Sequence, residues 1–135
     1  MTAYLLDTNH ASPTVTLDHP LRQLILEKLD QGDSFAICVP TVTELLFGIS
    51  TLPRASITLA EWRRLRPYLN YYSLDEQDAE IAAELQTALR RRGRQLETVD
   101  ALIAAIALRY ELTLLTTDKD FSVVPGLLLQ NWRST

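Results

Sequence analysis

Short runs of apolar, strand-forming residues alternate along this chain with longer segments of helical periodicity, and this alternation limits the fold more than any other feature. The runs at 3–6, 35–39, 71–74, 112–116 and 127–130 predict five strands. Between the runs, apolar residues recur every three or four positions, as they do on the buried face of a helix. Strands joined by helices are typical of an α/β protein with a largely parallel central sheet.

Prolines, glycines and capping residues mark where the helices begin and end. A proline suits the first helical turn, a glycine suits the position after the last turn, and Asp or Thr can cap a helix start. The predicted boundaries lie at Pro20, Gly32, Pro40, Pro67, Asp75, Arg92, Gly93 and Thr98. The helix that we expect Thr98 to cap is the most apolar, and we expect it to be central.

The length of 135 residues predicts a single domain that covers residues 1–135. Apolar residues make up 47% of the chain and charged residues 22%, which excludes disordered and fibrous classes. No apolar run approaches the roughly 20 residues that cross a bilayer, so we expect a cytoplasmic protein that has no membrane partner. Cys38 is the only cysteine, which excludes a disulfide framework and a cysteine zinc site.

Four acidic residues are predicted to meet at one edge of the sheet. Asp7 directly follows the first strand, and Asp118 follows the fourth. Glu44 is expected in the first turn of the helix after the second strand, and Asp100 in the first turn of the helix before the fourth. Because helix N-termini gather where parallel strands end, all four side chains should reach one crevice.

Each acid also has a structural explanation. Asp7 and Asp118 could shape turns, Thr41-x-x-Glu44 has the spelling of a capping box, and Asp100 would suit a helix dipole. These explanations do not account for convergence, because clustered carboxylates repel one another unless a cation lies among them. An all-oxygen site suits Mg²⁺ or Mn²⁺ rather than zinc. His10 lies near Asp7 in the sequence, but we interpret it as a loop histidine with satisfied hydrogen bonds.

The segments "YLLDTN", "PTVTELLFG", "TVDALIAAIAL" and "LLTTDKDF", followed by "VPGLLLQNW", resemble the PIN domain family, and specifically its VapC-type toxins. The resemblance runs from Ala3 to Trp132, although "HASPTVTL" is less typical of the family. It implies a three-layer α/β/α sandwich, Mg²⁺-dependent cleavage of an RNA substrate, a homodimer, and a cognate antitoxin. The residues that match the family's catalytic and metal-binding acids are Asp7, Glu44, Asp100 and Asp118. Asn9 and Thr116 match positions that support the carboxylates, and Asp120 is a further acid of undefined role.

Arginines cluster in two segments although the net charge is −4. The cluster of Arg90, Arg91, Arg92 and Arg94 could bind RNA phosphates or could be a solvated helix face. The segment "WRRLRPYL" and the pair Tyr71 and Tyr72 could form an interface or pack in the core.

Two other classes of protein compete with the ribonuclease interpretation. A phosphatase of the haloacid dehalogenase type needs a second Asp where Asn9 stands, which counts against that class. A PIN-like interaction module without catalytic activity remains the alternative, and a metal titration would distinguish it from an enzyme.

Overall fold

Five parallel strands form one sheet in the order β3-β2-β1-β4-β5 in the computed structural model, which describes residues 1–133. The strands are β1 (Ala3–Leu6), β2 (Ser34–Cys38), β3 (Asn70–Tyr72), β4 (Thr113–Leu115) and β5 (Leu129–Gln130). All five predicted strands are present, and β3 begins one residue earlier than expected. Residues 134 and 135 of the predicted domain lie outside the described residues, so the extent of the domain stays a prediction.

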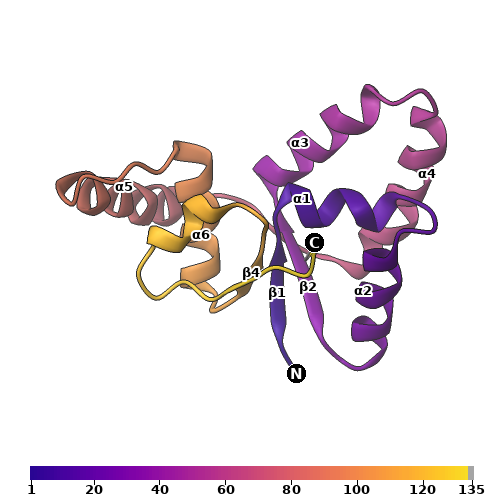
Figure 1. Cartoon of the computed structure of the whole chain (residues 1–135), viewed down its shortest axis with the longest axis horizontal. Coiled ribbons are helices and arrows are strands. Elements are labelled where there is room, and N and C mark those ends of the chain that lie inside the picture. Colours follow the sequence, from indigo (N-terminus) through magenta and orange to yellow (C-terminus); the bar gives the residue numbers. More distant parts are fainter. Residues whose placement is uncertain (134–135) are drawn as a thin grey trace.

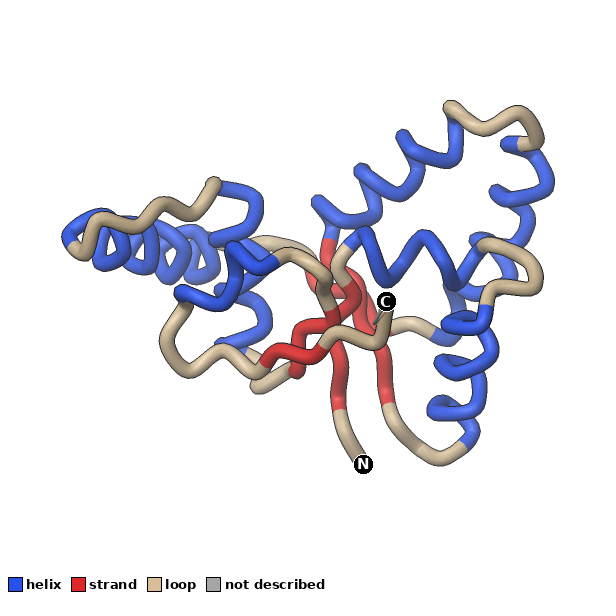
Figure 2. The backbone as a smooth tube through the Cα atoms, in the orientation of Figure 1, coloured by secondary structure: helices blue, strands red, loops and turns tan. Residues whose placement is uncertain are grey.

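Helices cover both faces of the sheet, which confirms the predicted three-layer α/β/α sandwich (Figure 1). One face carries the short helix α1 with α2, α3 and α4, and the other carries α5 and α6. The bounds are α1 (Thr8–Ala11), α2 (Pro20–Asp30), α3 (Val39–Ser50), α4 (Ala55–Leu65), α5 (Glu76–Arg91) and α6 (Thr98–Arg109). Within residues 1–133, three 3₁₀ turns complete the fold: η1 (Ser12–Val15), η2 (Arg66–Tyr68) and η3 (Lys119–Val123). Figure 2 shows the strands between the two groups of helices.

Side chains alternate between the two faces of the strands and divide the core in two. Leu5 and Leu114 point toward α5 and α6, where the alanine-rich α6 packs closely against the sheet. Leu6, Phe35 and Leu115 point toward the cluster of α1 to α4. The central strands are therefore buried on both faces, which explains why they appear in the sequence as continuous apolar runs.

Several helix boundaries follow the predicted signals. Pro20 opens α2, and Asp75 caps α5 in a reciprocal capping box with Asp78. Gly93 follows α5 with a φ of 71°, a conformation that favours glycine, and the amide of Arg94 donates to the carbonyl of Leu89 to close the helix.

Two expectations about helix starts were wrong. The chain enters α3 at Val39, so Thr41 lies inside the helix and makes no capping box with Glu44, which sits in the second turn. Pro40 is the second residue of α3 rather than the first, a position in the first turn that a proline also tolerates. Glu97, not Thr98, is the residue before α6, and its side chain makes no capping hydrogen bond.

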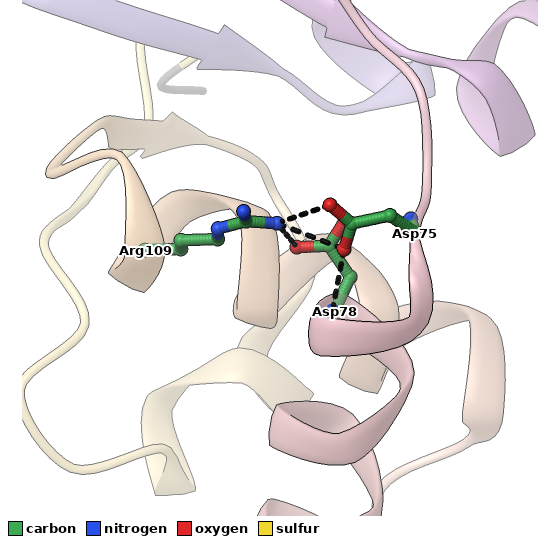
Figure 3. Close-up of polar contacts among 3 residues, drawn as sticks. All are labelled: Asp75, Asp78 and Arg109. Atoms are coloured by element: carbon green, nitrogen blue, oxygen red, sulfur yellow. Dashed lines mark hydrogen bonds and ion pairs between the residues drawn. The ribbon is translucent and has the colours of Figure 1, made fainter.

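An ion cluster fastens α5 to the end of α6 (Figure 3). Arg109 Nη1 lies 2.9 Å from both carboxylate oxygens of Asp75 and 3.0 Å from Oδ1 of Asp78, which is fully buried. Pairing with Arg109 holds the pKa of Asp75 below its usual range. The cluster therefore ties the first turn of α5 to the last turn of α6, at the end of that helix opposite Asp100.

The "WRRLRPYL" segment divides between core and surface. Trp62 and Leu65 are buried in the core, whereas Tyr68 is 69% exposed and Arg66 lies over the ring of Tyr71 at 5.3 Å. The described residues contain no helix of the length and apolar character that a membrane crossing requires.

Candidate active site at the carboxyl edge of the sheet

The sheet has a topological switch point between β1 and β4. The chain leaves β1 toward β2 on one side, whereas β4 lies on the other side and is followed by β5. In open α/β sheets such a point leaves a crevice at the carboxyl ends of the two strands. Asp7 follows β1 there, and its amide donates to the carbonyl of Leu115 at the end of β4 over 3.1 Å.

Three carboxylates meet beside this crevice. Asp100, Asp118 and Asp120 each offer an oxygen, and these oxygens lie within 4.8 Å of one another. Asp100 comes from the first turn of α6, and Asp118 caps η3 by accepting a 2.9 Å hydrogen bond from the amide of Asp120. Two predicted site residues therefore meet, together with one acid whose role the sequence left undefined.

The charge of Asp7 affects two of the other acids. Burial raises the pKa of Asp100 to about 6, and the negative charges of Asp118 and then Asp7 add to the effect. The pKa of Glu44 is also raised, first by partial desolvation and then by the charge of Asp7. Asp7 therefore lies close enough to Asp100 and Glu44 for its charge to raise their pKa values. Among the described residues, neither Asp7 nor Glu44 belongs to the cluster formed by Asp100, Asp118 and Asp120.

Asp7 is the most constrained of the acids. It is buried, and its Oδ1 accepts from the amide of Thr8 at 2.9 Å. Its Oδ2 accepts from the hydroxyl of Thr116 at 2.7 Å and from the side-chain amide of Asn9 at 3.3 Å. These hydrogen bonds bring the side chains of Asn9 and Thr116 into contact with the Asp7 carboxylate.

Thr116 links Asp7 to the acidic trio. Its Oγ1 accepts from the amide of Asp118 at 3.0 Å and from Asn9 Nδ2 at 3.3 Å, so its own proton is free to go to Asp7. One hydroxyl thereby sets the spacing between the acid that follows β1 and the acid that follows β4.

The donor set fits a hard divalent cation. All candidate ligands are carboxylate oxygens, which Mg²⁺ and Mn²⁺ prefer, and the repulsion that raises the pKa of Asp100 is what a bound cation would relieve. The signal for Asp120 was present in the sequence as Asp118-x-Asp120. Asp118 caps η3 and Asp120 lies in its first turn, where its carboxylate comes within reach of those of Asp118 and Asp100.

The predicted arginine cluster lies at the end of α5 and is exposed throughout. Arg92 and Arg94 line an open cleft of about 450 Å³ together with Ser122 and Val124. The turn η3 begins next to Asp118 and ends at this cleft, so it connects the arginines to the acids. Arg90 and Arg91 do not line the cleft.

Both the sequence and the fold resemble those of known proteins. Residues 4–127 match the PIN domain family. Ribonuclease VapC2 from Rickettsia felis is 27% identical over 130 residues, which cover 96% of this chain and 97% of the relative. The crystal structure of VapBC2 from Rickettsia felis, bound to a DNA fragment from their promoter, has a TM-score of 0.83 at 26% identity and covers 97% of this chain and 99% of its own. VapBC-5 from Mycobacterium tuberculosis, a member of the VapBC family of toxin–antitoxin systems, has a TM-score of 0.67 at 25% identity and covers 99% of this chain and 100% of its own.

Proposed function

The chain belongs to the PIN domain family, and from this premise we propose that it is a metal-dependent endoribonuclease and the toxin of a toxin–antitoxin pair. One observation carries the proposal: three carboxylates converge beside the buried Asp7 at the switch point of the sheet. The relative named as a ribonuclease, which aligns over nearly the whole chain, supports the choice of RNA as substrate.

Several of the acids would bind the Mg²⁺ or Mn²⁺ ion. Asp7, Asp100 and Asp118 would hold the cation, and Glu44 would assist from α3, while the position of Asp120 makes it a further ligand. When bound, such a cation lowers the pKa of a water molecule and neutralises charge that grows on phosphate oxygens. The protein supplies no side-chain nucleophile in this scheme.

The residues of this chain orient the site before any substrate arrives. Thr116 and Asn9 fix the Oδ2 atom of Asp7, which leaves the carboxylate little freedom to rotate. The raised pKa of Asp100 leaves this carboxyl ionised at neutral pH but easily protonated in mild acid. Cleavage should therefore weaken as the pH falls toward 6.

The RNA is proposed to cross the site from the arginine cleft. Arg92 and Arg94 present guanidinium groups that can bind phosphates, and η3 runs from their cleft to Asp118. Arg90 and Arg91 are exposed on the same helix end and would add to the positive potential without lining the cleft.

The test is RNA cleavage by purified protein with Mg²⁺, with Mn²⁺ and with EDTA. Asp7→Asn and Asp100→Asn should abolish metal-dependent cleavage and keep the fold, because each preserves volume and removes one charge. Asp30→Asn, at an exposed position on α2, is the matched control and should cleave like the wild type. Wild-type rates for Asp100→Asn would refute the assignment of the site.

The alternative function, an interaction module without catalysis, makes a different prediction for the same protein. Such a module would bind no Mn²⁺ in a calorimetric titration and would cleave no RNA. Binding of Mn²⁺ that Asp100→Asn weakens and Asp30→Asn leaves unchanged would exclude it.

A homodimer and an antitoxin complete the proposal, and the similarity to VapBC structures supports the antitoxin. The antitoxin is expected to place a basic side chain among the carboxylates and so compete with the cation. Light scattering should give about twice the chain mass, and adding the antitoxin encoded beside this gene should stop cleavage. A monomer at high micromolar concentration would contradict the dimer, and a complex that cleaves RNA fully would contradict competition at the site.

A further inference from the structure

His10 is fully buried near the site, and the proposed chemistry gives it no role. Its Nδ1 lies 2.7 Å from Oδ1 of Asn9, and its Nε2 accepts from the backbone amide of Trp132 over 3.0 Å. We propose that His10 is a positioning residue, which holds Asn9 and through it Asp7, and which is itself held by the backbone of Trp132. This rests on the proposed function only in that Asp7 is taken as a ligand of the cation.

Two backbone amides determine the direction of every hydrogen bond in this chain of contacts. The amide of Thr117 can only donate, so the Asn9 atom that it meets at 3.0 Å is the oxygen, and the Asn9 nitrogen faces Asp7. The amide of Trp132 can also only donate, so Nε2 of His10 carries no proton. The proton of a neutral His10 is then on Nδ1, where it is donated to Asn9.

Every polar atom of the Asn9 side chain is used. Its oxygen accepts from His10 and Thr117, and its nitrogen donates to Asp7 and Thr116. The amide therefore cannot rotate without losing four hydrogen bonds. Without the donor on His10, the oxygen would keep only the hydrogen bond from Thr117, and the amide would be held less firmly against Asp7.

Burial keeps His10 in the neutral form that this arrangement needs. Desolvation lowers the pKa of His10 to about 4, and the nearby positive charge of Arg133 adds to the effect. Arg133 also donates from Nη1 to the carbonyl of Asn9 at 2.9 Å.

The segment after β5 is held firmly enough to serve as the anchor. The ring of Trp132 packs edge-on against Tyr4 at 4.8 Å and against Phe35 at 5.9 Å between ring centroids. Figure 2 shows this loop segment passing beside α1, at the carboxyl edge of the sheet. The position of the Trp132 amide is thus set by the core, and His10 transmits that position to Asn9.

Three substitutions separate positioning from packing. His10→Asn can keep a donor near the place of Nδ1 but loses the acceptor for Trp132. His10→Gln reaches the place of Nε2 and can accept from Trp132, but it has no group near Nδ1. His10→Phe keeps the ring and loses both hydrogen bonds.

The readouts are Mn²⁺ affinity by calorimetry, RNA cleavage and melting temperature. Positioning predicts that His10→Asn, which keeps the donor to Asn9 but loses the anchor on Trp132, loses less Mn²⁺ affinity than His10→Gln and His10→Phe. The latter two should lose about tenfold, the low end for residues that orient metal ligands. If His10 acted through packing alone, His10→Asn would have the lowest Mn²⁺ affinity of the three variants. It leaves the largest cavity and should therefore also have the lowest melting temperature. Affinities that follow the melting temperatures would overturn the proposal.

A measurement on the wild-type protein covers the case in which a variant fails to fold. Nitrogen-15 NMR correlations through the imidazole carbons distinguish a proton on Nδ1 from one on Nε2. We expect the proton on Nδ1 in the metal-free protein, and a proton on Nε2 would overturn the proposal. Because affinity and tautomer are measured without RNA, a protein that cleaves no RNA would refute the proposed function and leave this test valid.

Discussion

Asp100→Asn tests what it costs the metal-free protein to ionise a partly buried carboxyl next to other acids. The pKa of Asp100 is raised from its ordinary 3.8 to about 6, by burial first and then by the charges of Asp118 and Asp7. Below about pH 4 the carboxyl is protonated in both the folded and the unfolded state. As the pH rises through about 6 the folded state must lose that proton, so the stability that the protonated carboxyl contributes is lost.

The size of the effect follows from this difference in pKa. A change from 3.8 to about 6 corresponds to ~3 kcal/mol if it is fully expressed. Asp100 is only half-buried, and screening by solvent reduces this to ~1.5 kcal/mol. Asparagine cannot ionise, so at pH 7.5 the variant should melt about 5 °C above the wild type, a scale set by the entropy of unfolding of a domain of this length.

The assay is thermal unfolding in EDTA between pH 4 and 8, followed by circular dichroism. The advantage of Asp100→Asn should be close to zero near pH 4 and should grow through pH 6. Mg²⁺ should raise the melting temperature of the wild type at pH 7.5 more than that of the variant, because the cation relieves the same repulsion. An advantage that is absent at pH 7.5, or equal at both ends of the range, would refute the reasoning.

Two further predictions concern the arginines. Replacing Arg92 and Arg94 together by Gln should weaken RNA binding. The slope of log affinity against log salt should fall by about 1.4, since about 0.7 is lost for each phosphate contact to a single strand. Equal binding of variant and wild type in a filter assay would mean that both arginines are only solvated surface residues. Arg109→Met should lower the free energy of unfolding in urea by ~3 kcal/mol, because it leaves the fully buried Asp78 without its partner. Asp75→Asn, at the exposed end of the same cluster, is the control and should cost less than ~1 kcal/mol; equal losses would mean that burial of Asp78 does not matter.

The sequence predicted the fold well because the fold is encoded by local signals of a simple kind. Strands buried on both faces appear as apolar runs, and the long helices carry strong periodicity and boundary residues. The errors fall where a side chain can serve two purposes. Thr41 and Glu44 have the spelling of a capping box, but α3 begins at Val39, and Glu44 is therefore free to face Asp7.

The site was only partly predictable, for a different reason. The placement of Asp7, Asp100 and Asp118 follows from topology, since helix starts and strand ends share one edge of a parallel sheet. The role of Asp120 depends on a 3₁₀ turn, and that of His10 on a contact with a residue 122 positions away. Neither a five-residue turn nor a single long-range hydrogen bond leaves a periodic signal in the sequence.

Segments far apart in the sequence meet at Asp7, and their contacts fix the orientation of its carboxylate. A carboxylate placed after β1 could adopt several rotamers, and only one of its hydrogen-bond donors, the amide of Thr8, is its neighbour in the sequence. The hydroxyl of Thr116 comes from the segment after β4, and the amide of Asn9 is held by Thr117 from that same segment. The match to the PIN domain family ends at residue 127, yet the anchor of the remaining contact is Trp132, beyond that limit. Because β5 pairs in parallel with β4, the chain continues past the same edge, and Trp132 reaches His10 directly from the strand end. The short strand β5 thus contributes to the site through its direction and through Gln130, whose Oε1 accepts from the indole nitrogen of Trp132 at 2.9 Å.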